Sequence, residues 1–145
     1  MISVLLAACV SAAPGGSAQV RLKHLGTAGW EVTDGKTVVL IDPYLSRLRR
    51  VIPNDDALAT DTRQLFAGDD VARTDAAVVD AHIQRADFLL ITHTHFDHAM
   101  DLPYIAAKTG ATVIGTESTY NLARAYGVAG DKLITVRGGE DYGRR

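Results

Sequence analysis

The sequence predicts a layered α/β fold, and three observations support this prediction. Short β-branched and apolar runs alternate with helical patterns along the chain. Asp34-Gly35 is a strong hairpin signal between two of the first runs. The chain contains no internal repeat, so the alternating elements are expected to pack as layers.

The first part of the chain is predicted to be a small antiparallel unit. Residues 20–26 and 30–33 have the pattern of strands, and residues 37–42 are rich in β-branched side chains. The turn at Asp34-Gly35 joins the second and third strands, because this dipeptide favours a two-residue hairpin connection.

The second part is predicted to alternate helices and strands. Asp101 is a candidate cap of one helix, Pro103 is tolerated in its first turn, and Gly110 closes it. Thr116 and Gly127 bracket another helix in the same way. The expected helices cover residues 58–66, 76–85, 101–108 and 117–126, and the expected strands cover residues 87–92, 111–115 and 132–136.

Composition indicates an ordinary globular protein. The 145 residues are 47% hydrophobic and 22% charged, within the usual range for one domain. The net charge of -2 offers no electrostatic basis for binding nucleic acid. Arg47, Arg49 and Arg50 form a local basic group, which is either solvated surface or a contact for an anionic substrate.

Residues 93–98, His-Thr-His-Phe-Asp-His, are the most informative stretch of the chain. Three of the five histidines fall within these six positions, directly after the apolar run at residues 88–92. Imidazoles and a carboxylate crowded at the end of a buried strand are costly without partners, and they are good metal ligands. His24 and His82 stand alone and are expected to be surface or satisfied core residues.

The spacing within this stretch favours two metal ions side by side. Alternate side chains of an extended segment point the same way, so His93, His95 and Asp97 can share one side. A turn into a helix at this point would bring Asp97 and His98 together beside the histidine pair. One metal would then be held by His93 and His95, and the other by Asp97 and His98.

The motif His-x-His-x-Asp-His after a hydrophobic strand resembles the signature of the metallo-β-lactamase superfamily. Residues 25–30 (Leu-Gly-Thr-Ala-Gly-Trp), the strand at 38–41 and residues 42–46 (Asp-Pro-Tyr-Leu-Ser) also resemble that superfamily. The similarity is greatest to the branch that includes the ascorbate-phosphate lactonase-like hydrolases. It extends from about residue 20 to about residue 142.

The resemblance implies roles for individual residues. His93 and His95 would bind the first metal, Asp97 and His98 would bind the second, and Asp97 would also handle protons in catalysis. The cofactor implied is Zn²⁺, two ions per complete site, with manganese or iron as alternatives. Asp42 resembles a family aspartate that supports the metal ligands from behind, although aspartate before proline is also a common turn residue.

The chain departs from the family after His98. Relatives complete the site with further histidines and a bridging aspartate, and no histidine follows His98 here. We therefore expect residues 19–145 to form the N-terminal half of an αββα metallo-β-lactamase sandwich, truncated on its C-terminal side. Such a half would expose an apolar sheet face and an open strand edge, which favours self-association.

The expected function is that of a metal-dependent hydrolase acting on a small-molecule substrate. A hydroxide activated by the metals would attack an ester, lactone, amide or phosphoester. The alternatives are a truncated, inactive metal-binding fragment and a non-enzymatic envelope lipoprotein that uses the fold as a scaffold. A diiron oxidoreductase of the same fold is disfavoured, because that branch resembles His-x-Glu-x-Asp-His and His95 stands at the glutamate position.

Residues 1–18 are expected to be a leader and a tether. No charged residue occurs before Arg21, and Leu6-Ala7-Ala8-Cys9 resembles a bacterial lipoprotein cleavage box. In this interpretation Cys9 is lipidated and anchors the protein to a membrane, in the periplasm or outer envelope. The alternatives are a start further upstream, and a cytoplasmic protein in which Cys9 is a small buried residue.

Overall fold

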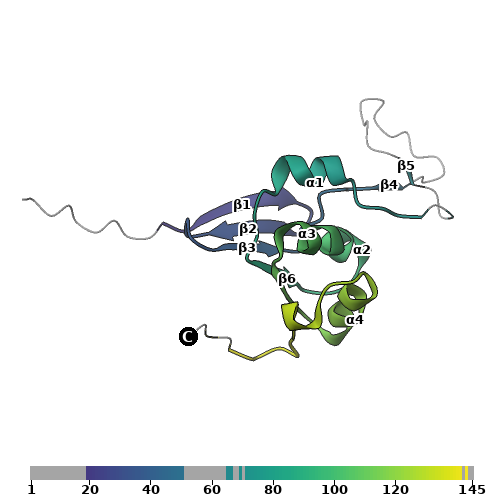
Figure 1. Cartoon of the computed structure of the whole chain (residues 1–145). Helices are drawn as coiled ribbons and strands as arrows, with labels where there is room; N and C mark the ends of the chain where they lie inside the picture. Colours follow the sequence, from purple (N-terminus) through teal and green to yellow (C-terminus); the bar gives the residue numbers. More distant parts are fainter. Residues whose placement is uncertain (1–18, 51–64, 67–68, 70, 142, 144–145) are drawn as a thin grey trace, which may run out of the picture.

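The computed structural model describes residues 19–50, 65–66, 69, 71–141 and 143, which form a six-stranded sheet with helices packed against it (Figure 1). The strands of this sheet, in spatial order, are β1 (Arg21–Gly26), β2 (Gly29–Thr33), β3 (Val38–Ile41), β6 (Phe88–Ile91), β7 (Thr112–Gly115) and β8 (Leu133–Thr135). The helices are α1 (Ala76–His82), α2 (Phe96–Ala99), α3 (Leu102–Thr109), α4 (Glu117–Ala125) and the short 3₁₀ helix η1 (Gly130–Lys132). A separate parallel pair consists of β4 (Arg49–Arg50) and β5 (Leu65–Phe66).

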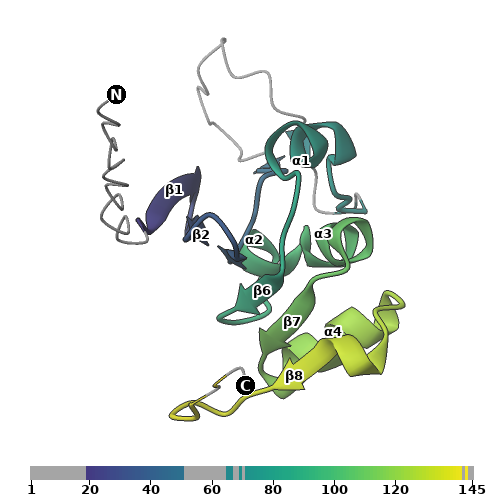
Figure 2. The same ribbon diagram turned by 60° about the vertical axis from the view of Figure 1, so that its left-hand side comes forward.

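The sheet combines an antiparallel meander with a parallel half. Strands β1, β2 and β3 are antiparallel neighbours, and β6, β7 and β8 continue the sheet parallel to β3. Figure 2 shows the sheet running from β1 at one edge to β8 at the other. Parallel neighbours require crossover connections, which here contain α1, then α2 and α3, then α4. The predicted α/β fold is confirmed.

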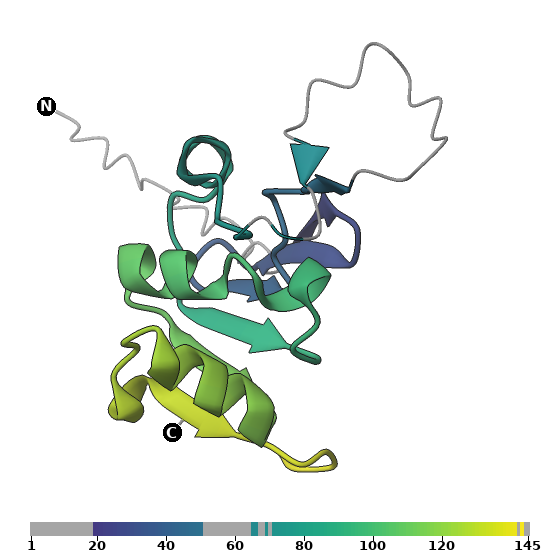
Figure 3. The ribbon, with the colours of Figure 1, turned by 90° about the vertical axis from the view of Figure 1, so that its right-hand side faces the viewer.

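The core lies on the face of the sheet that carries the helices. Leu40, Leu89 and Val113 are direct neighbours in register, and each is at most 1% exposed. They share one cluster with Ile105 of α3 and Ala123 of α4. Figure 3 shows α3 and α4 lying along the strands. The alternation of buried and half-buried residues along β6 and β7 follows from the two-residue period of a strand.

The opposite face of the sheet is apolar but lies outside the core cluster. Ile41, Leu90 and Ile114 are neighbours in register on this face and remain half-buried. Trp30, paired with Ile41, is 40% exposed, and Leu22 is 67% exposed. This agrees with the sheet face expected of half a sandwich. Self-association through that face stays a prediction.

The hairpin between β2 and β3 forms where the sequence predicts it. Oδ1 of Asp34 accepts hydrogen bonds from the backbone N–H groups of Thr37 and Lys36 at 2.7 and 2.8 Å. These bonds favour the ionised carboxylate and lower the pKa of Asp34. Gly35 has φ 89°, a left-handed conformation that glycine adopts without strain.

Three predicted details are wrong. The helix expected over residues 76–85 ends at His82, because Ile83 is extended and fully buried in the core. Asp101 occupies the N-cap of α3, but its side chain makes no capping hydrogen bond. Within the helix expected at residues 58–66, the described residues Leu65–Phe66 form a strand.

Several predictions fall on parts of the chain that the structure does not describe. The rest of the helix expected at residues 58–66 lies outside the described residues. The same is true of the leader and tether at residues 1–18, including Cys9. Within the described ranges, no helix has the length and apolar character needed to cross a bilayer.

Candidate metal centre

The histidine-rich segment lies at the carboxyl ends of two neighbouring parallel strands. β3 and β6 pair with Ile41 opposite Leu90, so the segments that follow them meet at one edge of the sheet. Asp42 continues the ladder by donating its backbone N–H to the Leu90 carbonyl at 2.9 Å. We call residues 42–46 the β3 loop and residues 92–98 the metal loop. Crevices at such edges are common ligand sites in α/β proteins.

The metal loop brings its four predicted ligands together. The ring centroid of His93 lies 4.0 Å from that of His98 and 4.6 Å from that of His95. The chain is extended at His95 and enters α2 at Phe96, which is the turn that the two-metal arrangement requires. This turn places Nε2 of His98 within 3.7 Å of Oδ2 of Asp97.

Asp42 lies behind the metal loop and contacts it through both carboxylate oxygens. Oδ1 accepts a hydrogen bond from the Thr92 backbone N–H at 2.8 Å, and Oδ2 accepts one from the Thr92 hydroxyl at 2.7 Å. Oδ2 also lies 2.9 Å from Nδ1 of His98. Asp42 is 2% exposed, and its φ of 43° is left-handed, a conformation that aspartate tolerates better than most residues. Its contacts are those of a residue that supports the ligands from behind.

Asp42 and Thr92 together determine which nitrogen of His93 carries a proton. An ionised carboxylate only accepts hydrogen bonds, so the Thr92 hydroxyl proton points to Asp42. The lone pairs of that hydroxyl then face Nδ1 of His93, 3.1 Å away. We infer from these partners that Nδ1 of His93 carries the proton and that Nε2 keeps a free lone pair.

The same carboxylate acts on His98 directly. Nδ1 of His98 faces Oδ2 of Asp42, so a proton on Nδ1 leaves Nε2 as the free nitrogen, on the side of Asp97. Within the described part of the chain, this Nδ1 is buried and makes no hydrogen bond of good geometry, although the two atoms are close enough to form an ion pair. A ligand on Nε2 would fix the ring orientation, as happens in carboxylate–histidine–metal triads.

The donor set suits a divalent cation but is incomplete for a single ion. Imidazole and carboxylate ligands are those of zinc, manganese and iron sites. Among the described residues, no group of three or more His, Cys, Asp or Glu side chains could hold one metal ion. The two predicted pairs, His93 with His95 and Asp97 with His98, each supply two donors. Zinc normally takes four ligands, so each pair needs donors from elsewhere.

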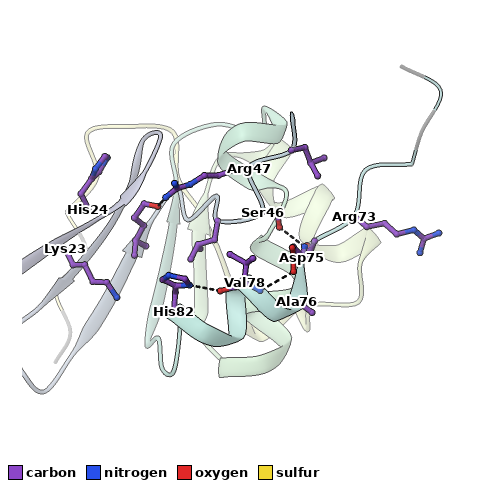
Figure 4. A pocket seen from close by; sticks show the side chains of 13 residues that line it. Lys23, His24, Ser46, Arg47, Arg73, Asp75, Ala76, Val78 and His82 are labelled. Carbon is purple, nitrogen blue, oxygen red and sulfur yellow. Dashed lines mark hydrogen bonds between the residues drawn. The ribbon is translucent and has the colours of Figure 1, made fainter. Parts of the chain in front are cut away.

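Two cavities flank the β3 loop and the metal loop. One, of about 850 Å³, lies beside the β3 loop between β1 and α1 (Figure 4), and no metal-loop residue lines it. His24 and His82 line this cavity and contact backbone carbonyls, so, as expected, neither belongs to the metal cluster. The other cavity, of about 720 Å³, reaches the metal loop at Thr94 and Phe96.

The described fold and site define an α/β protein with a dense metal-ligand motif at the carboxyl edge of its sheet. The chain belongs to the metallo-beta-lactamase superfamily, whose family model matches residues 25–132. A UPF0173 metal-dependent hydrolase of Exiguobacterium sp. is 38% identical over 118 residues, which cover 80% of this chain and 39% of the relative. One of Symbiobacterium thermophilum is 30% identical over 95 residues, which cover 66% of this chain and 31% of the relative.

A solved structure has the same fold. It is Igni18, a metallo hydrolase from the archaeon Ignicoccus hospitalis, with a TM-score of 0.54 and 20% sequence identity. The alignment covers 83% of this chain and 41% of that chain. The superfamily predicted from the metal-loop motif is confirmed, and the chain spans only 31–39% of the length of the two relatives named above.

Sequence reasoning misses two residues of this site. Thr92 stands between the last strand residue of β6 and His93, where a hydroxyl can reach both neighbouring groups, and this position is a usable signal. Asp101 is expected from local pattern to cap α3, but its carboxylate bonds the backbone of the β3 loop. No local signal separates these roles, because its partners Leu45 and Ser46 are 56 and 55 positions away.

Proposed function

We propose that the protein is a metal-dependent hydrolase in which the metal loop binds zinc. The ligands are His93, His95, Asp97 and His98. Divalent cations bound there polarise a substrate and lower the pKa of a water molecule toward neutrality. Membership of the superfamily and the relatives named as metal-dependent hydrolases support this proposal.

The observation that carries the proposal is the set of contacts that Asp42 and Thr92 make with the proposed ligands. Asp42 faces His98 directly and His93 through the Thr92 hydroxyl. A proton on Nδ1 of each ring would leave its Nε2 lone pair free to bind a metal ion. Residues that orient ligands in this way are a regular part of metal sites.

Two residues of the metal loop support the proposal of hydrolysis. The Asp97 side chain is 39% exposed, so it can accept a proton from an attacking water molecule while its Oδ2 stays near His98. Phe96 is 50% exposed and packs edge-on against Tyr44, with ring centroids 6.0 Å apart. Its ring provides an apolar wall beside the ligands. We propose a small ester, lactone, amide or phosphoester as the substrate.

Replacing His95 with alanine tests the ligand assignment. His95 is exposed and its side chain makes no capping hydrogen bond, so the fold should survive the change. We expect the zinc bound per chain and the hydrolysis of a generic ester, lactone or phosphodiester to fall together. Hydrolysis should fall by more than about tenfold. Removal of a residue that only orients a ligand already lowers metal affinity or activity by about this factor, and removal of a ligand should cost more. Elemental analysis and hydrolysis assays on the same gel-filtered sample measure both quantities.

The matched control is His82→Ala. His82 is also exposed, and its ring contacts the Val78 carbonyl on α1 at 2.9 Å, away from the metal loop. Zinc content and hydrolysis should both be unchanged in this variant. Hydrolysis at the wild-type rate in His95→Ala would show that the ligand assignment is wrong.

A second candidate function is metal binding without hydrolysis by this chain alone. Two observations favour it: no three donors converge on one ion within the described ranges, and the chain spans 31–39% of the relatives' length. About two zinc ions per chain with hydrolysis would support the enzyme. Bound zinc without hydrolysis would identify the metal-binding segment instead.

A further inference from the structure

Two buried carboxylates join the metal loop and the β3 loop, and each reaches from one segment to the other. Asp42 belongs to the β3 loop and accepts hydrogen bonds from Thr92 of the metal loop. Asp101 comes three residues after the metal loop and accepts hydrogen bonds from the backbone N–H groups of Leu45 at 2.7 Å and Ser46 at 2.8 Å in the β3 loop. The arrangement is reciprocal. Asp42, which follows β3, holds the metal loop, and Asp101, which follows β6, holds the β3 loop.

Within the described part of the chain, the hydrogen bonds of the Asp101 carboxylate come from the β3 loop. The residue is 0% exposed. Besides the two backbone N–H groups, the Ser46 hydroxyl donates a hydrogen bond to Asp101, with 2.5 Å between Oγ of Ser46 and Oδ1 of Asp101. The Ser46 oxygen in turn accepts the backbone N–H of Asp75, before α1, at 2.7 Å (Figure 4). A buried carboxylate with three donors is satisfied in place and is costly to remove.

We infer that Asp101 is a positioning residue of the metal site. It holds the β3 loop where the Asp42 carboxylate meets Thr92 and His98, and it acts on the ligands only through Asp42. The part of this inference that concerns metal affinity rests on the proposed function; the part that concerns the position of Asp42 does not.

Asp101 anchors the part of the β3 loop that lies beyond the end of strand β3. Strand β3 ends at Ile41, and after the Asp42 N–H the backbone has no ladder partner on β6. Pro43 carries no N–H group, and further along the loop the N–H groups of Leu45 and Ser46 both donate to Asp101. Leu45 is 5% exposed, and without Asp101 its N–H would be buried and unpaired unless the loop moved. Such a movement displaces Asp42.

The first measurement is hydrogen–deuterium exchange of the Thr92 amide in the metal-free full chain, in Asp101→Ala and Asp101→Asn. The Thr92 N–H donates to Asp42, so its protection reports the position of that carboxylate. We expect exchange about tenfold faster in Asp101→Ala, relative to the Leu89 amide of the core strand in the same variant. Asparagine keeps one accepting oxygen, so its effect should be intermediate. This variant also decides the question if alanine prevents folding.

The matched control is Asp80→Asn. Asp80 lies on α1 and accepts hydrogen bonds from Tyr104 and Lys108 of α3, and its described bonds reach neither loop. It therefore removes a carboxylate that fastens the helices without touching the site. Thr92 exchange relative to Leu89 should equal that of the wild type.

The second measurement is zinc affinity, by competition with a chromogenic chelator. We expect the dissociation constant to rise about tenfold in Asp101→Asn and to be unchanged in Asp80→Asn. Wild-type Thr92 protection in both Asp101 variants would overturn the inference, and so would equal weakening of zinc binding by Asp80→Asn. A wild-type chain that binds no zinc would refute the proposed function instead, and Thr92 exchange would still show whether Asp101 positions Asp42.

Discussion

The chain holds two carboxylate networks that use the same chemistry in opposite surroundings. Asp42 and Asp101 are 2% and 0% exposed, and most of their donors are backbone N–H and hydroxyl groups of neighbouring loops. Asp80 is exposed and accepts from the Tyr104 hydroxyl at 3.0 Å and Lys108 Nζ at 2.6 Å. Water replaces a lost partner at the surface but not in the interior. The buried network can therefore set the geometry of a site, whereas the exposed one only fastens two helices.

The largest effect is expected from Asp42→Ala. This change removes the partly buried acceptor of the Thr92 N–H and hydroxyl and the carboxylate that faces the His98 ring, and it puts alanine at φ 43°. We expect the free energy of unfolding to fall by about 3 kcal/mol, measured by urea denaturation without metal. Asp42→Asn keeps one acceptor and should lose less. A loss as small as that of Asp80→Asn would remove the distinction between the two networks.

Thr92→Val should have an intermediate effect that sharpens the comparison. Valine has nearly the shape of threonine but cannot donate to Asp42 or accept from His93. We expect a loss of about 1 kcal/mol in unfolding free energy. We also expect His93 to populate both tautomers while His98 keeps its proton on Nδ1. Long-range ¹H–¹⁵N spectra of the imidazoles report this, and an unchanged His93 tautomer would contradict the proposed relay through Thr92.

The smallest effect is expected from Asp80→Asn, and it should depend on pH. Hydrogen bonds from Lys108 and Tyr104 lower the pKa of Asp80 below its ordinary value of 3.8. A carboxyl group with a lowered folded-state pKa stabilises the fold above its unfolded pKa and loses that contribution as the pH falls through the folded value. The stability difference between wild type and variant should therefore be present at neutral pH and disappear in acid, below pH 3.8.

Salt provides the control for this prediction, because an exposed pair is screened. The neutral-pH difference should shrink at high ionic strength when unfolding is followed at several salt concentrations. A difference that persisted in acid and in salt would mean that Asp80 is as deeply coupled to the fold as Asp42.

The sequence predicted those features of the fold that depend on interactions between residues close together in the chain. The strand before the metal loop is recognisable because Phe88–Ile91 is an uninterrupted apolar run. The hairpin at Asp34-Gly35 depends on bonds within four residues. The turn that brings Asp97 and His98 together is the one that the two-metal hypothesis required, and helix α2 begins there.

The features that the sequence did not predict depend on contacts between residues that are far apart in the chain. Asp101 looks like a helix cap until Leu45 and Ser46 are placed beside it. The helix that begins at Ala76 loses its expected last turn because Ile83 is drawn into the core, a tertiary effect that overrides helix propensity. Strand β5 is defined by its pairing with β4, and the two strands are separated in sequence by residues that the structure does not describe.

Position 42 shows how few residue types a position can tolerate when its backbone conformation and its contacts are both restricted. Its positive φ admits glycine, asparagine and aspartate with little strain. Thr92, which donates to it, and His98, whose Nδ1 lies 2.9 Å away, favour a short anionic side chain. Aspartate alone meets both demands. Selection for metal binding would therefore permit only synonymous changes at this codon.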